Sequence, residues 1–272
     1  MRPIEMQDLY SYQYLSALAA APHGEKAALV VKHPRKDSND YTGDIWLYEN
    51  GALRQLTADG KGDAPVWEDE HHLLFPAMRE EKDRKRAKEG EKFSVFYRLD
   101  IRGGEAQKAF ELPIAARGLE RLTDPLWFFT APIDREVPDE YLMTEEARKE
   151  LAKTRKENGD YHVLTDLSYR MNGAGFREGT VPALFLYDAE SGETERLTGP
   201  EVKVSFAQAI DGAIVYGAAA YQTTETLFSQ VYRYDPATGE TQTLYGGNDH
   251  AFRNAFGLGD ALILLGSDCK DY

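Results

Sequence analysis

Apolar and polar residues alternate in several short stretches of the chain, and each stretch leads into a turn that contains glycine. Three segments share this pattern, at residues 45–57, 184–198 and 231–244, and a looser fourth copy lies at 95–105. A period of two residues is typical of a β-strand. An Asn-Gly, Ser-Gly, Thr-Gly or Gly-Gly step supplies the positive φ of a tight turn. Each segment is therefore predicted to be a β-hairpin.

The hairpins recur along the chain. Tyr48, Leu99, Tyr187 and Tyr234 hold equivalent positions and are separated by 51, 88 and 47 residues. Two further short strand-like runs precede each hairpin, as at 27–31 and 73–77. Four short strands in roughly 45 to 50 residues form the blade unit of a β-propeller, whereas a β-sandwich does not predict repetition at this length. The sequence therefore predicts an all-β fold, a β-propeller of four-stranded blades.

Two segments interrupt the repeat. The long spacing falls at 134–180, where Glu145 and Glu146 precede Arg155 and Lys156. This order of charge suits the helix dipole and predicts one helical insertion near 138–158. Residues 79–92 hold seven basic and five acidic residues without apolar periodicity, and are predicted to form a solvated loop.

The last residues begin another repeat. Residues 252–258 and 261–265 are predicted to be the first two strands of a fifth blade, and Tyr272 comes before the hairpin that would complete it. About four and a half blades are expected, in an open or truncated propeller. Because unpaired blade edges attract other strands, residues 1–272 are expected to be a partial propeller from a longer gene product.

Composition narrows the range of partners. The 272 residues include 46 Asp and Glu against 32 Lys and Arg, a net charge of −14, which repels nucleic acid and anionic lipid surfaces. The sequence shows no apolar run long enough for a membrane span or a signal peptide. A single cysteine, Cys269, requires no oxidising compartment. A cytoplasmic location is expected, with no nucleic-acid or membrane partner.

No cofactor is predicted. His71 and His72 are adjacent on a predicted strand, so their side chains point to opposite faces and cannot share a metal ion. Gly103-Gly104 and Gly246-Gly247 are turn glycines without the strand-to-helix context of a phosphate loop.

The blade entrances resemble those of a known family. The run Ala-Pro-His-Gly-Glu-Lys at 21–26 resembles the Ser-Pro-Asp-Gly-Lys turn of propellers in the prolyl oligopeptidase family of serine peptidases and in TolB-like proteins, and 65–75 is a second, degenerate copy. The repeated Leu-Thr endings at 56–57 and 197–198 fit both groups. Residues 169–175 resemble the Tyr-Arg-x-Asp-Gly-x-Gly segment of acylaminoacyl-peptidase-like members, with Asn172 in place of Asp.

The resemblance implies an enzyme in two parts, a propeller followed by an α/β-hydrolase domain that carries Ser, Asp and His. No serine of this chain lies in a Gly-x-Ser-x-Gly elbow, and the nearest, Ser267, lacks both flanking glycines of that pattern. No catalytic residue is assigned, and the chain alone is predicted to be inactive.

The expected function is to gate the access of short peptides to the downstream hydrolase active site. The expected partners are that domain and a short peptide, and the sequence leaves homo-oligomerisation open. An acidic channel lining would favour substrates with a positive N-terminus. The alternative is a non-enzymatic TolB-like scaffold that binds a protein partner.

Tyr169, Arg170 and Asn172 are the candidate contacts to substrate or to the hydrolase domain. The glycines beside Asn172 suit a tight loop. Arg170 offers a planar fork for a carboxylate, which leaves two interpretations. Arg170 either pairs with a neighbouring carboxylate within the turn, or faces the hydrolase domain or the carboxylate end of a peptide.

Overall fold

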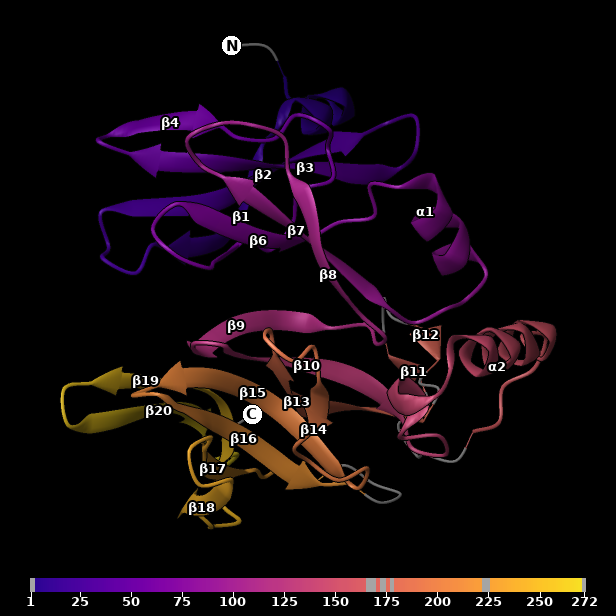
Figure 1. Cartoon of the computed structure of the whole chain (residues 1–272), viewed down its shortest axis with the longest axis vertical. Helices are drawn as coiled ribbons and strands as arrows, with labels where there is room; N and C mark the ends of the chain where they lie inside the picture. The colour runs from indigo at the N-terminus through magenta and orange to yellow at the C-terminus, as the bar shows by residue number, and fades with distance from the viewer. Residues whose placement is uncertain (1–2, 165–169, 172–174, 177–178, 222–225, 271–272) are drawn as a thin grey trace. The chain divides into compact units, whose positions relative to one another are not determined.

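The computed structural model of the chain describes residues 3–164, 170–171, 175–176, 179–221 and 226–270 (Figure 1). It divides into two compact units. The first contains Met1–Lys88 and Phe93–Leu112, and the second contains Glu89–Lys92 and Pro113–Tyr272.

The first unit holds two four-stranded antiparallel sheets whose strands are ordered as in the sequence. Blade 1 consists of β1 (Tyr14–Ala20), β2 (Lys26–Arg35), β3 (Asp40–Glu49) and β4 (Ala52–Gln55). Blade 2 consists of β5 (Val66–Trp67), β6 (His72–Pro76), β7 (Ser94–Asp100) and β8 (Gln107–Leu112). A 3-10 helix, η1 (Met6–Ser11), precedes blade 1, and helix α1 (Glu81–Lys88) lies between β6 and β7.

The second unit holds two further blades and a pair of strands. Blade 3 consists of β9 (Arg117–Thr123), β10 (Leu126–Asp134), β13 (Thr180–Asp188) and β14 (Thr194–Arg196). Blade 4 consists of β15 (Val202–Ile210), β16 (Ala213–Ala220), β17 (Gln230–Asp235) and β18 (Glu240–Tyr245), and the half blade is β19 (Ala251–Leu258) with β20 (Ala261–Ser267). Between β10 and β13 lie η2 (Glu140–Leu142), α2 (Glu145–Glu157), β11 (Arg170–Met171) and β12 (Gly175–Phe176).

The four predicted hairpins are the third and fourth strands of the four blades, which confirms the predicted equivalence. Each marker residue pairs with the second residue of its neighbouring strand: Tyr48 with Ala27, Leu99 with Leu73, Tyr187 with Trp127, and Tyr234 with Ile214. The all-β, open-propeller prediction is confirmed, with four blades and a half blade.

The repeated Leu-Thr pair fixes the end of the hairpin in the same way in blades 1 and 3. The buried hydroxyl of Thr57 accepts the N–H of Ile45 at 2.9 Å, and that of Thr198 accepts the N–H of Leu184 at 3.0 Å. The preceding leucine N–H donates to the carbonyl of the same partner residue at 2.8 Å in both blades. A short sequence repeat thus corresponds to one repeated hydrogen-bond arrangement.

Apolar side chains pack between neighbouring blades. One cluster joins blade 1 to blade 2 through residues such as Val30, Leu47 and Phe75. In the second unit, Ile214 and Tyr216 of β16 contact blade 3, while Val215 contacts the half blade. Because both faces of blade 4 are covered, β16 is an almost continuous apolar run rather than an alternating one.

The prediction of a solvated loop at 79–92 was wrong, because residues 81–88 form helix α1. Glu81 and Asp83 lie in its first turn and Lys85, Arg86 and Lys88 in its last, an order that favours a helix through its dipole. The absence of apolar periodicity was misleading, since the buried side chain of this helix is an acid, Asp83.

The predicted helical insertion near 138–158 is confirmed by η2 and α2. The Thr144 hydroxyl caps α2 by accepting the N–H of Ala147 at 3.3 Å. Arg155 anchors the helix, because its guanidinium donates to Asp134 at 2.7 Å and to both carboxylate oxygens of Glu140 at 2.8 Å. The insertion leaves blade 3 intact, since β10 and β13 stay paired along their whole length.

Candidate functional site

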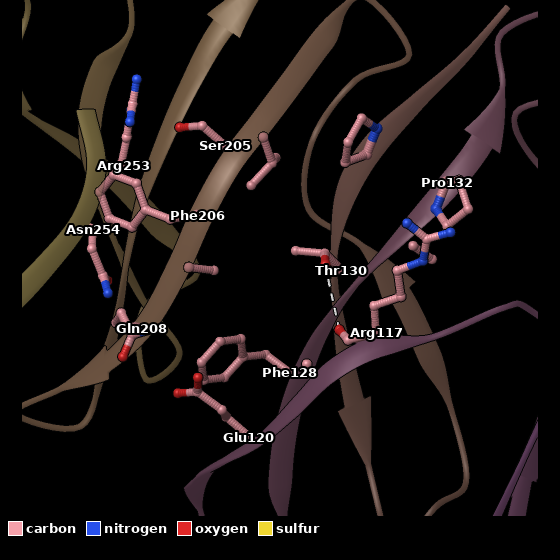
Figure 2. Close-up of a pocket in the computed structure, with 15 residues that line it drawn as sticks. Arg117, Glu120, Phe128, Thr130, Pro132, Ser205, Phe206, Gln208, Arg253 and Asn254 are labelled. Atoms are coloured by element: carbon pink, nitrogen blue, oxygen red, sulfur yellow. Dashed lines mark hydrogen bonds between the residues drawn. The ribbon is translucent and has the colours of Figure 1, made fainter. Parts of the chain in front are cut away.

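A pocket of about 400 Å³ lies within the second unit, where the first strands of three successive blades contribute side chains (Figure 2). Arg117, Gly118 and Glu120 come from β9, residues 204–208 from β15, and Arg253 and Asn254 from β19. The blades of a propeller surround a central channel. The pocket lies within the second unit, on the first strands of blades 3 and 4 and the half blade, with further lining from β10 and β13 of blade 3.

Every first strand that contributes to the pocket carries a β-bulge there. The register of β9 against β10 shifts between Phe128 and Thr130, that of β15 against β16 between Val204 and Phe206, and that of β19 against β20 between Phe252 and Asn254. A bulge adds a residue to one strand and redirects the side chains beside it. Ser205 and Arg253 are such added residues, which explains why consecutive residues of one strand share the pocket.

The pocket has an apolar floor and a polar margin. Phe128, Val204 and Phe206 are buried and belong to the cores between blades. Figure 2 shows Arg117 and Arg253 on opposite sides of the pocket, with Phe128 and Glu120 at its lower edge. The hydroxyl of Ser205 donates to the carbonyl of Phe252 at 3.2 Å and so connects β15 to β19 beside the pocket.

Glu120 is the acid of the pocket lining. Its carboxylate accepts the N–H of Ala209 at 3.3 Å. Burial raises the pKa of Glu120, and this single backbone hydrogen bond opposes the rise. The charged side chains of the lining are two arginines and this glutamate, so the lining of this pocket is not predominantly acidic.

Of the three residues predicted from the sequence, the structure describes Arg170, which does not line the pocket. Tyr169 and Asn172 lie outside the described residues, and Arg170 is an exposed residue of β11, in the connection between β10 and β13. Its guanidinium lies 5.8 Å from the ring centroid of Phe176, which in turn stacks on His162 at 4.4 Å. Among the described residues no carboxylate pairs with Arg170, and the role of all three residues stays a prediction.

Sequence reasoning missed Arg117, Glu120 and Arg253. Bulges break the period of two on which strand faces are assigned, so no simple pattern places these side chains together. The remaining signal is position, because each lies on the first strand of its blade or half blade.

A peptidase is similar to this chain in sequence. No family model matches the chain. An uncharacterized peptidase of Bacillus subtilis, YuxL, is 27% identical over 183 residues, which cover 65% of this chain and 25% of that protein. The chain thus spans about a quarter of the length of this relative.

Solved structures share the fold. An acylaminoacyl peptidase in complex with Z-Gly-Gly-Phe-chloromethyl ketone matches 92% of this chain and 35% of its own, with a TM-score of 0.61 and 15% identity. The acylaminoacyl peptidase of Pyrococcus horikoshii matches 90% of this chain and 34% of its own, with a TM-score of 0.59 and 15% identity. The β-propeller domain of the trilobed protease from Pyrococcus furiosus, which has an open velcro topology, matches 96% of this chain and 70% of its own, with a TM-score of 0.50 and 16% identity.

At these identities the solved structures establish the fold, while the match to YuxL connects the sequence to a peptidase. In the described part of the chain, no helix is long and apolar enough to cross a membrane. The chain is similar to the propeller region of acylaminoacyl-peptidase-like members of the prolyl oligopeptidase family, as the sequence motifs indicated.

Proposed function

We propose that this chain is the non-catalytic propeller region of a serine peptidase and controls which peptides reach a downstream α/β-hydrolase active site. The observation that carries the proposal is the pocket on the first strands of blades 3 and 4 and the half blade. A rigid, partly apolar channel admits an extended peptide and excludes a folded protein by size. The peptidases that share the fold favour this function over a TolB-like scaffold.

The gene product that includes this chain provides the first test. We expect the sequence after residue 272 to contain a Gly-x-Ser-x-Gly elbow followed by Asp and His. A fluorophosphonate probe should label the full-length protein at that serine and leave the 272-residue chain unlabelled, because the chain has no activated nucleophile. Further blades followed by a stop codon would contradict the proposal, as would stoichiometric labelling of the short chain.

Gating is tested by narrowing the pocket in the full-length enzyme. Thr130 lines the pocket and its hydroxyl donates to the Arg117 carbonyl at 3.4 Å, so Thr130→Trp places a large ring in the path. We expect kcat/KM for a peptide of about five residues to fall roughly tenfold, equivalent to about 1.4 kcal/mol, while a small ester substrate is unaffected.

Thr243→Trp is the matched control, because Thr243 is an exposed residue of β18 and does not line the pocket. Equal losses for peptide and ester in Thr130→Trp would indicate a general structural defect. Unchanged kinetics for both substrates would mean that peptides take another route.

Arg170 is proposed to contact the hydrolase domain or the carboxylate end of the peptide. In the full-length enzyme, Arg170→Ala should cost about 1.5 to 3 kcal/mol of charge-assisted binding, seen as a higher KM or a lower kcat/KM. Its melting temperature should stay nearly unchanged, since the side chain is exposed. A sharp drop in melting temperature with unaltered kinetics would identify Arg170 as structural.

A further inference from the structure

Arg117 and Arg253 differ from the other arginines that the structure describes. No hydrogen bond, ion pair or ring contact joins either of these two guanidinium groups to another residue that the structure describes. Elsewhere in this unit arginines are paired, as Arg135 is with Glu201 at 3.0 Å and Arg196 with Asp139 at 2.9 Å. Acids outnumber bases by 14 in the whole chain, so a shortage of acidic partners does not explain the two unpaired side chains.

Both unpaired arginines line the same pocket. Each is exposed, and they extend from different strands, β9 and β19, on opposite sides of the pocket (Figure 2). Guanidinium groups present several N–H donors in a plane and bind carboxylates through paired hydrogen bonds. Two such groups at one pocket leave a surplus of positive charge and of hydrogen-bond donors.

The same pocket also has an apolar part. Phe128 and Phe206 contribute to its lining and belong to the cores between blades, so an apolar side chain of a ligand finds a matching surface there. Glu120 is the acid of the lining, so the two arginines leave the lining with more basic than acidic side chains. The side-chain amides of Gln208 and Asn254 lie at the same pocket and offer hydrogen bonds to peptide groups.

We propose that this pocket binds a peptide carboxylate between Arg117 and Arg253, with an apolar side chain of the same peptide against Phe128 and Phe206. The inference deepens the proposed channel function by naming the class of peptide, one that carries a free C-terminal carboxylate or an acidic side chain. The geometry thus favours anionic peptides, although the chain as a whole is acidic.

Binding by the 272-residue chain is the direct test, because it requires no hydrolase activity. The probes are acetyl-Ala-Leu with a free C-terminus, its C-terminal amide, and acetyl-Asp-Leu-amide, measured by isothermal titration calorimetry. We expect the first probe to bind and its amide to bind at least roughly tenfold more weakly, the size of one charge-assisted hydrogen bond. Binding of acetyl-Asp-Leu-amide would identify a side-chain carboxylate as an equivalent ligand, and its failure would restrict the site to a C-terminus.

The arginine variants assign the effect to the pocket. Arg117→Gln and Arg253→Gln should each weaken acetyl-Ala-Leu roughly tenfold, and Arg117→Lys should keep part of the affinity. Arg121→Gln is the matched control, because Arg121 lies on the same strand, outside the pocket, where it pairs with Asp124 at 3.7 Å. Thermal melting verifies that each variant is folded.

Equal binding of the acid and the amide would overturn the proposal, and so would a loss in Arg121→Gln as large as in the pocket variants. Inorganic phosphate serves as a further probe, and phosphate binding as tight as that of acetyl-Ala-Leu would overturn the peptide part. If acetyl-Ala-Leu does not bind as expected, the Thr130→Trp experiment can still support the channel. If Thr130→Trp leaves peptide hydrolysis unchanged, the binding experiment can still support the carboxylate site. The two proposals therefore fail separately.

Discussion

The two inserted helices occupy equivalent places in their blades, between the second and third strands, yet ionic groups hold them differently. In α2, Arg155 joins the acids Asp134 and Glu140, and Lys92 lies 3.3 Å from Glu140. In α1, Asp83 is completely buried, neither of its carboxylate oxygens has a hydrogen bond within the described structure, and the nearest ion-pair partner is Arg86 at 3.6 Å. Removing one partner of a well-paired buried acid is strongly destabilising, whereas a buried acid that is poorly paired already costs free energy.

The largest expected effect is the loss of the anchor of α2. Arg155→Met keeps the apolar stem of the side chain and leaves Glu140 and Asp134 without their guanidinium partner. The free energy of unfolding should therefore fall by about 2 to 3 kcal/mol. This loss is smaller than for a fully buried ion pair, because Arg155 is partly exposed. Urea unfolding measures the loss, and hydrogen exchange should rise across residues 145–157 first.

Lys149→Met is the control for that variant. Lys149 pairs with Glu145 on the exposed side of α2, and such pairs contribute less than about 0.5 kcal/mol. A similar loss in both variants would show that Arg155 is not the anchor.

The comparison predicts a change of the opposite sign in α1. Asp83→Asn removes a buried charge, while Arg86 keeps its ion pair with Glu111 at 2.9 Å. The free energy of unfolding should therefore stay the same or rise by up to about 1 kcal/mol. Urea unfolding of the single variants Asp83→Asn and Arg86→Met, and of the double variant, measures the coupling between the two residues.

A clear destabilisation by Asp83→Asn, about 2 kcal/mol or more, would contradict this view. It would mean that the carboxylate of Asp83 is as well stabilised as that of Glu140, and the contrast between the two helices would disappear.

Glu120 extends the comparison to an acid that has one backbone hydrogen bond. Burial raises the pKa of Glu120 in the folded chain. At a pH between its ordinary pKa and this raised pKa, the Glu120 carboxyl is protonated more in the folded chain than in the unfolded chain. The free energy of unfolding therefore falls as pH rises through that window. Glu120→Gln should match the wild type at lower pH and become more stable than it above the window, as thermal melting at several pH values will measure. Glu190→Gln, at an exposed turn position, should show no such divergence.

The sequence predicted the parts of the fold that depend on local periodicity. The hairpins at Tyr48, Tyr187 and Tyr234 were found because alternation and turn glycines act within a few residues. Helix α2 was found from the order of its charges. Helix α1 has the same order of charges and was missed, because its one buried residue is Asp83 and the pattern lacked an apolar face.

The candidate site was much less predictable. Arg117 and Arg253 come from strands far apart in the sequence, and bulges set the direction of their side chains. Bulges arise from the pairing of two strands, so they follow from tertiary structure rather than from a local pattern. Net charge averages over the whole surface, so it does not predict the lining of one pocket, whose charge depends on Arg117, Glu120 and Arg253.

The Leu-Thr pair has a consequence for how such chains change over evolution. Its leucine N–H and its threonine hydroxyl both bond to the third strand of their own blade, as Thr57 does to Ile45 and Thr198 to Leu184. A blade of this kind sets the end of its own hairpin, so a duplicated gene segment has to fit its neighbours only through the apolar faces. The connection between the second and third strands is also free to lengthen, from residues 36–39 in blade 1 to residues 135–179 in blade 3. New recognition elements can therefore be acquired there while the repeat remains intact.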